Sequence, residues 1–178
     1  MTNLIDAILE NDHESLDELL TKLDQELAAP SEDRAFELLD LFWARLAVHI
    51  RAEHLHLFPA LVKEASKFSG DDSLPSLAEV EETIARLRSD HDFFMKELAD
   101  MMKNVRDIRE NRESLHQELP RLRERLSVIW TRLKSHNKLE EEHVYVWPTR
   151  VLDQQMYGDL ISQVRHELEN LPPRFALK

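Results

Sequence analysis

Two stretches of the sequence decide the fold, and they read His49-Ile50-Arg51-Ala52-Glu53-His54-Leu55-His56 and His136-Asn137-Lys138-Leu139-Glu140-Glu141-Glu142-His143. Each follows a stripe of apolar residues spaced three and four apart, which is typical of one face of an α-helix. In both, the stripe continues through a histidine, a glutamate four residues later and a second histidine three residues after that. Because residues four apart lie above one another on a helix, each stretch is predicted to direct an imidazole and a carboxylate into the protein interior.

The composition favours one all-α domain. The chain has 178 residues with only 2 glycines and 7 prolines, and 42% of its residues are hydrophobic, which suits long helices better than a turn-rich β protein. The apolar spacing predicts four long helices and a shorter one, with a kink at Phe58-Pro59. Leu119-Pro120 is either a second kink or the first turn of the fourth helix. The predicted helices span residues 3–28, about 32–68, about 77–111, about 120–145 and 151–170.

The first and third helices each carry one histidine, His13 and His91, in place of an apolar residue of the stripe. Each of these histidines, like His49 and His136, lies about 15 or 16 residues from a predicted helix end, so antiparallel packing at 1.5 Å per residue brings all four to one height. We therefore expect an up-down-up-down four-helix bundle over residues 1–150, with residues 151–178 forming a short extra C-terminal helix and tail that pack on it. The candidate metal ligands are His13, His49, Glu53, His91, His136 and Glu140.

Charge and cysteine content limit the partners. The formal net charge is −12, so nucleic acid and anionic membrane surfaces would be repelled, whereas small cations would be attracted. The chain has no cysteine, so a metal would be held by nitrogen and oxygen ligands. The N-terminus lacks a basic segment followed by an apolar run, and no stretch is apolar enough to span a bilayer. We expect a soluble, cytoplasmic protein that binds neither nucleic acid nor membranes.

The two glutamates favour a metal site over an ordinary polar core. A single histidine on an apolar stripe is more often a hydrogen-bonded core residue than a ligand, but glutamate is rarely buried without a partner. Burying Glu53 and Glu140 unpaired would cost several kcal/mol each or force protonation. The stripes carry no lysine or arginine that could neutralise them. Metal cations would supply the missing charge.

Counting ligands indicates the kind of metal. Four imidazoles and two bridging carboxylates would give each of two ions, about 3.5 Å apart, two nitrogen and two oxygen ligands. A bridging solvent oxygen would be a fifth ligand and would leave one open position on each ion. Structural zinc prefers a closed tetrahedral site and calcium prefers oxygen alone. The mixed set favours two oxo- or hydroxo-bridged non-haem iron ions, with manganese or zinc as substitutes.

With these residues the chain resembles the hemerythrin-like family, also called HHE cation-binding domains. The resemblance covers roughly residues 5–148. It implies an up-and-down four-helix bundle around a non-haem di-iron centre. It rests on His13, on His49-x3-Glu53 with the trailing Leu57-Phe58-Pro59, on His91, and on His136-x3-Glu140 with the trailing Trp147-Pro148.

The chain departs from oxygen-carrying hemerythrins at two positions. In those proteins the histidine of the third helix is followed by a second histidine one turn later, and the corresponding position after His91 in this chain is Met95. They also have an aspartate five residues after the histidine of the fourth helix, where this chain has Glu141. Reversible oxygen transport is therefore not implied. The resemblance implies a protein that binds or senses O2, NO or iron, in oxidative or nitrosative stress or in iron–sulfur repair.

His56 and His143 leave an alternative open. Each follows a glutamate by three residues, which is the spacing of ferritin-like di-iron bundles. The alternative function is accordingly a ferritin-like di-iron oxidase or a peroxidase-type enzyme, and the sequence does not decide between enzyme and sensor. In the hemerythrin-like interpretation the two histidines donate hydrogen bonds to the ligands or act as extra ligands. A third interpretation is a helical partner-binding module without metal.

The other polar residues near these stretches are given ordinary roles. His54, His116 and His166 lie off the apolar stripes, and we expect them to face solvent. Tyr145 lies one turn beyond Glu141, and we expect it to pack in the core rather than to take part in the chemistry.

Overall fold

The computed structural model describes residues 4–28, 32–67, 74–110 and 115–175, which contain helices and no strand. The predicted all-α class is confirmed, and the predicted helices match the observed ones within a few residues. The exception is the fourth long helix, which begins five residues before Pro120. The elements are α1 (Leu4–Ala28), α2 (Glu32–Ala52), the π-helical turn η1 (Glu53–Leu57), α3 (Phe58–Ala65), α4 (Leu77–Glu110), α5 (Leu115–Leu139), the π-helical turn η3 (Glu140–Val144), α6 (Pro148–Val151), α7 (Gln154–Glu169) and the 3-10 turn η4 (Pro173–Phe175).

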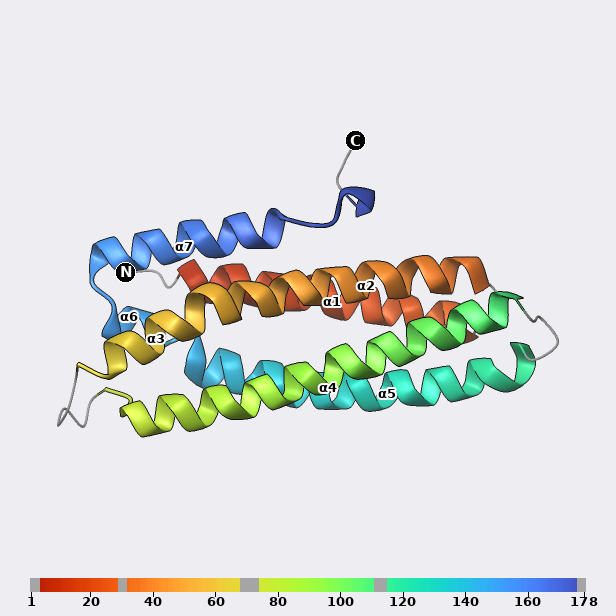
Figure 1. Cartoon of the computed structure of the whole chain (residues 1–178), viewed down its shortest axis with the longest axis horizontal. Helices are drawn as coiled ribbons and strands as arrows, with labels where there is room; N and C mark the ends of the chain where they lie inside the picture. Colours follow the sequence, from red (N-terminus) through yellow and green to blue (C-terminus); the bar gives the residue numbers. More distant parts are fainter. Residues whose placement is uncertain (1–3, 29–31, 68–73, 111–114, 176–178) are drawn as a thin grey trace.

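The four longest helices form a helical bundle (Figure 1). α1 packs against α2 and α5, and α4 packs against the other sides of α2 and α5. Each of the four helices therefore has two neighbours and turns one face toward a shared interior. α7 lies outside this group, along α2 and η1. Among the described residues, no helix is both long and apolar enough to cross a membrane.

Two apolar clusters fill the bundle interior, one toward each end. The first contains Leu16 to Leu27 of α1 together with Phe94 of α4, and the second contains Ile5 and Leu9 of α1 together with Leu87 of α4. α1 and α4 therefore pass from one cluster to the other at the position of a histidine. Each fully buried leucine contributes about 1.5–3 kcal/mol. The packing thus fixes four histidines at the boundary between two water-excluding layers.

The His49–His56 and His136–His143 stretches both run into a π-helical turn. In η1 the N–H of Phe58 donates to the carbonyl of Glu53, and in η3 the N–H of Tyr145 donates to the carbonyl of Glu140 at 2.8 Å. The kink predicted at Phe58-Pro59 therefore takes the form of a wide turn just before it, and Pro59 lies in the first turn of α3, where no backbone donor is needed. A π turn brings residue i+5, rather than i+4, over residue i. Phe58 and Tyr145 thus lie above the two glutamates.

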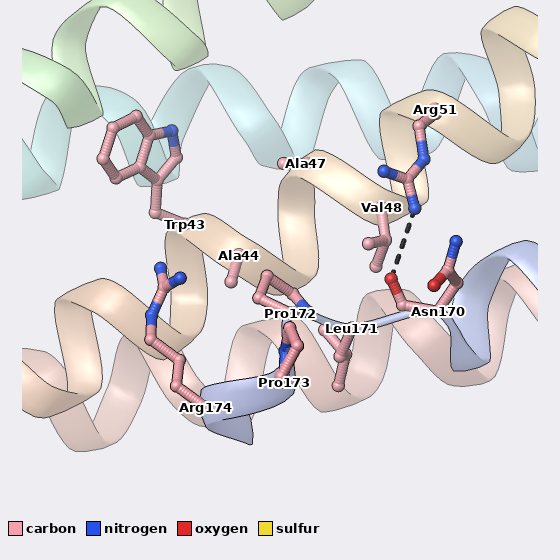
Figure 2. A pocket seen from close by; sticks show the side chains of 10 residues that line it. All are labelled: Trp43, Ala44, Ala47, Val48, Arg51, Asn170, Leu171, Pro172, Pro173 and Arg174. Carbon is pink, nitrogen blue, oxygen red and sulfur yellow. Dashed lines mark hydrogen bonds between the residues drawn. The ribbon is translucent and has the colours of Figure 1, made fainter. Parts of the chain in front are cut away.

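The segment after the bundle packs along α2. Arg51 of α2 pairs with Glu167 of α7 and donates a hydrogen bond of 3.2 Å to the carbonyl of Asn170. Figure 2 shows the groove between α2 and this segment, which has a volume of about 380 Å³. The groove is lined by Trp43, Ala44, Ala47, Val48, Arg51, Asn170, Leu171, Pro172, Pro173 and Arg174. None of these is a metal-ligand candidate, so this groove is not the metal centre.

Candidate metal centre

The structure brings all six predicted ligand residues together. They come from four helices and two π turns, with His13 on α1, His91 on α4 and Glu140 at the start of η3. None of the six exposes more than 5% of its surface, and both glutamates are fully buried. These six residues form one layer, which lies between the two apolar clusters and is therefore shielded from water on both sides along the bundle.

One half of the layer is formed by His13 and His49. Their Nε2 atoms lie 3.1 Å apart. Nε2 of His13 is 3.3 Å from Oε2 of Glu140, and Nε2 of His49 is 3.6 Å from Oε1 of Glu53. His13, His49 and Glu140 thus place three donor atoms close enough together to hold one ion, and Oε1 of Glu53 lies beside His49.

The other half is formed by His91 and His136 in the same way. Their Nε2 atoms lie 3.0 Å apart. Nε2 of His136 is 3.0 Å from Oε1 of Glu140, and Nε2 of His91 is 3.4 Å from Oε2 of Glu53. Each glutamate thus directs one oxygen into each half, which is the arrangement of a carboxylate that bridges two ions.

Every one of the four imidazoles is held by its second nitrogen. Nδ1 of His49 lies 2.9 Å from Oδ2 of Asp12, and Nδ1 of His136 lies 3.2 Å from Oδ2 of Asp90. The Nδ1 atoms of His13 and His91 are 2.8 Å from Oε1 of Glu141 and 2.9 Å from Nε2 of His54, respectively. Metal-binding histidines are generally oriented in this way. Asp12, Asp90, Glu141 and His54 are thus the outer partners of the four imidazoles, and they keep all four Nε2 atoms pointing at the centre.

The outer partners were missed in the sequence, although they repeat. Asp12 and Asp90 each directly precede a ligand histidine, and each binds the histidine of the next helix instead. Asp12 also pairs with Arg45, and Asp90 with Arg132, whose Nη2 lies 2.6 Å from Oδ1. The two arginines occur four residues before His49 and His136. The repeat Asp-His followed by Arg-x3-His-x3-Glu was therefore a readable signal.

Replacing either aspartate by asparagine is expected to weaken metal binding. Asp12→Asn and Asp90→Asn remove the anionic partner of His49 and His136, respectively, and loss of such a partner typically costs about 10–100-fold in metal affinity. The measurement is a competition titration of the metal-loaded protein with a chelator. Asp107→Asn, at an exposed position of α4, is the matched control. If Asp12→Asn and Asp90→Asn both bind metal as tightly as the wild-type protein, the two aspartates do not orient the ligand histidines.

The histidines and carboxylates of the centre form a buried proton-sharing network. Burial by itself lowers the pKa of His49, but Glu53 and Asp12 outweigh it and hold that pKa well above its usual value. Burial raises the pKa of Glu140, but His136 and His13 outweigh it and hold that pKa well below its usual range. Protons on imidazoles thus balance the buried carboxylates, and metal binding would displace these protons.

Two carboxylate oxygens in this network lack a well-directed hydrogen bond. Oε2 of Glu53 and Oε1 of Glu140 are buried and accept no well-directed hydrogen bond from any residue that the structure describes, although the Nε2 atoms of His91 and His136 lie 3.4 and 3.0 Å from them. Leaving such an atom unsatisfied costs about 1–3 kcal/mol or more. Both oxygens face the His91 half, where a cation would satisfy them together. The donor set therefore fits metal cations, and groups of three donors that suit an ion occur in both halves.

Tyr145 is more than the packing residue that the sequence suggested. Its ring is fully buried, and its hydroxyl donates to Oε1 of Glu53 at 2.8 Å. The same oxygen lies 3.2 Å from Nε2 of His13 and 3.3 Å from Nε2 of His49. Burial, followed by the charges of Glu140 and Glu53, raises the pKa of Tyr145 well above its usual value. The predicted burial of Tyr145 in the core is confirmed, but α-helical spacing gave no sign that its hydroxyl would reach Glu53 and the two histidines.

Three other histidines also differ from expectation. His54, expected in solvent, is half-buried with its ring against His91. His56 lies near α7, with Nε2 3.7 Å from Oε2 of Glu167, and His143 is exposed. The prediction that these two support or join the ligands is therefore wrong, and the ferritin-like spacing has no structural counterpart. His166 is exposed as predicted, whereas the side chain of His116 lies outside the described residues.

A groove reaches the His13 half from the surface between α1 and α5. Its volume is about 540 Å³. His13 and Glu141 form part of its wall, and the Glu141 side chain is 36% exposed. The other lining residues are Glu14, Asp17, Glu18, Lys134, Asn137 and Lys138. The carboxylates outnumber the lysines, so the groove attracts cations toward the buried layer.

Comparison with models of protein families identifies the family of this chain. The family model of the hemerythrin HHE cation-binding domain matches residues 4–147. No curated protein and no solved structure matches the chain. The matched segment covers most of the chain and contains all six gathered histidines and glutamates, so this chain belongs to the hemerythrin HHE cation-binding family.

Proposed function

We propose that this protein holds two non-haem iron ions in the buried layer and uses their open positions to bind or sense a small ligand, O2 or NO. One observation carries this proposal. Two pairs of Nε2 atoms each form a group with Glu140 that could hold an ion, and Glu53 directs one oxygen toward each pair. His13, His49, Glu53, His91, His136 and Glu140 are the proposed ligands.

The donor chemistry supports iron among the available metals. Each half supplies two imidazole nitrogens and two carboxylate oxygens, a mixed set that suits iron, manganese or zinc better than calcium or magnesium. Four protein donors leave positions free on an ion that takes five or six ligands. When bound, the ions would supply redox-active positions for a diatomic ligand. The protein would orient the imidazoles through Asp12 and Asp90 and exclude water with the two apolar clusters.

We propose the up-down-up-down bundle of residues 1–150 as the framework of this site. The neighbour relations of α1, α2, α4 and α5 support it. Residues 151–178 are proposed as an addition that packs on α2 and is not needed for the ligand set. The groove beside His13 and Glu141 is the proposed route by which ions reach the layer.

The function is tested by elemental analysis and spectroscopy of aerobically purified protein. We expect about two iron ions per chain, with the absorption of ferric non-haem iron. Adding NO or O2 to the reduced protein should then change the spectrum stoichiometrically. Catalytic consumption of many equivalents of peroxide would instead favour the enzyme interpretation. Protein that takes up none of iron, manganese or zinc would end the proposal.

A further inference from the structure

We propose that the phenol oxygen of Tyr145 is a ligand of the ion held by His13 and His49, so that the two ions of the centre are inequivalent. This inference rests on the proposed function, since it concerns the same ions. It assigns to one half of the layer a fifth protein donor that the other half lacks. It also places the small exogenous ligand on the ion held by His91 and His136.

The separations between donor atoms carry the assignment. The Tyr145 oxygen lies 2.8 Å from Oε1 of Glu53, 3.1 Å from Oε2 of Glu140, 3.2 Å from Nε2 of His13 and 3.3 Å from Nε2 of His49. Ligands at right angles around an ion with bonds of about 2.1 Å are about 3.0 Å apart. The phenol oxygen therefore has the spacing of a ligand to all four other donors at once.

The equivalent position in the other half has no donor atom. Tyr145 is the fifth residue after Glu140, and the fifth residue after Glu53 is Phe58. Both follow a π turn, so their rings occupy corresponding places. The Phe58 ring stacks on His91, with ring centroids 6.2 Å apart and an angle of 12° between the planes. The His91 half therefore keeps four protein donors and one more open position than the His13 half.

The outer partners also make the His13 half more anionic than the His91 half. His13 is held by a carboxylate, Glu141, whereas the corresponding partner of His91 is an imidazole, His54. A carboxylate partner raises the basicity of a ligand imidazole. The His13 half thus combines a phenol, a more basic imidazole and two carboxylate oxygens. These anionic oxygen donors favour the more highly charged ferric ion at this position.

Ion binding changes the role of the phenol proton. Without an ion, the Tyr145 hydroxyl donates this proton to Glu53. A group that binds a metal through an anionic atom must first lose its proton, so the proton is released to solvent when the oxygen binds the ion. Oε1 of Glu53 loses its hydrogen-bond donor in the same step and becomes free to bind the ion. The two changes occur together because one oxygen–hydrogen bond links the two donors.

The test uses the fact that the chain has two tyrosines, Tyr145 and Tyr157. Ferric ions bound by phenolate absorb visible light by charge transfer, and resonance Raman excitation in that band enhances the phenolate ring vibrations. We expect both signals in the iron-loaded wild-type protein. Tyr145→Phe should lose them while still binding iron. Tyr157→Phe is the matched control, because the Tyr157 hydroxyl accepts from the backbone N–H groups of Leu4 and Ile5, far from the centre, and this variant should keep both signals.

Each outcome decides the inference. Loss of the signals in Tyr145→Phe, or their retention in Tyr157→Phe, supports ligation by Tyr145, and the second result suffices if the first variant does not fold. Wild-type protein that holds two ferric ions without phenolate vibrations overturns this inference and leaves the proposed function standing. Signals that depend on Tyr157 also overturn it. Absence of bound iron in the wild-type protein overturns both.

Discussion

The replacement Glu140→Gln is expected to abolish binding of both metal ions, although it changes one residue. Glu140 directs Oε2 to His13 and Oε1 to His136, and it belongs to both groups of donors that suit an ion. The amide keeps the size of the side chain but removes the negative charge and leaves only one oxygen donor. The loss should exceed the about 100-fold that removal of an outer partner can cost. Elemental analysis after dialysis measures it.

Glu142→Gln is the matched control for this experiment. Glu142 lies two residues away in the same π turn, but its side chain is 57% exposed and its partner is Lys138, 3.7 Å away at the surface. This variant should bind the same amount of metal as the wild-type protein. Retention of both ions by Glu140→Gln would show that Glu140 does not bridge, whereas loss in both variants would point to a general effect on folding.

Removing the metal is expected to lower the thermal unfolding midpoint by on the order of 10 °C. A ligand at about 1,000 times its Kd stabilises the folded state by about 4 kcal/mol, and in a domain of this size 1 kcal/mol shifts the midpoint by about 2–4 °C. Scanning calorimetry of the loaded and chelated protein measures the difference.

The double replacement Glu53→Leu with Glu140→Leu separates the metal contribution from the packing. It fills the layer with apolar side chains, and such replacement of buried charged groups is often neutral or stabilising by about 1–4 kcal/mol. The variant should therefore unfold at a higher temperature than chelated wild-type protein and show no response to added metal. If chelation leaves the wild-type midpoint unchanged, metal does not contribute to the stability of this fold.

The helical architecture and the six site residues could be predicted because they follow from periodicity. Each candidate interrupts an apolar stripe at three- and four-residue spacing, so the side chains had to enter the interior once the stripe was buried. The equal heights followed from helix lengths, and the structure places the six residues in one layer. Their role as ligands is still a prediction. The outer carboxylates escaped notice, since Asp12 and Asp90 act on a neighbouring helix rather than on their own.

The wrong predictions for His56 and His143 and the missed contacts of the Tyr145 hydroxyl have one physical cause. Residues after Glu53 and Glu140 were placed by α-helical spacing, but both segments adopt a π turn there. An i+5 hydrogen bond rotates the following residues, so Tyr145 and Phe58 face the layer while His56 and His143 face away. Sequence gives no direct sign of such a turn, because its stability depends on packing around the buried carboxylates.

The sequence by itself determined that four amphipathic helices meet and that four histidines and two glutamates interrupt their apolar faces at one level. Hydrophobic spacing encodes this information locally along each helix. Only the tertiary structure decided which nitrogen of each imidazole points inward, which aspartate holds it, and that one half of the layer receives the hydroxyl of Tyr145 while the other receives the ring of Phe58. Those choices depend on contacts between residues distant in the chain, which no local pattern contains.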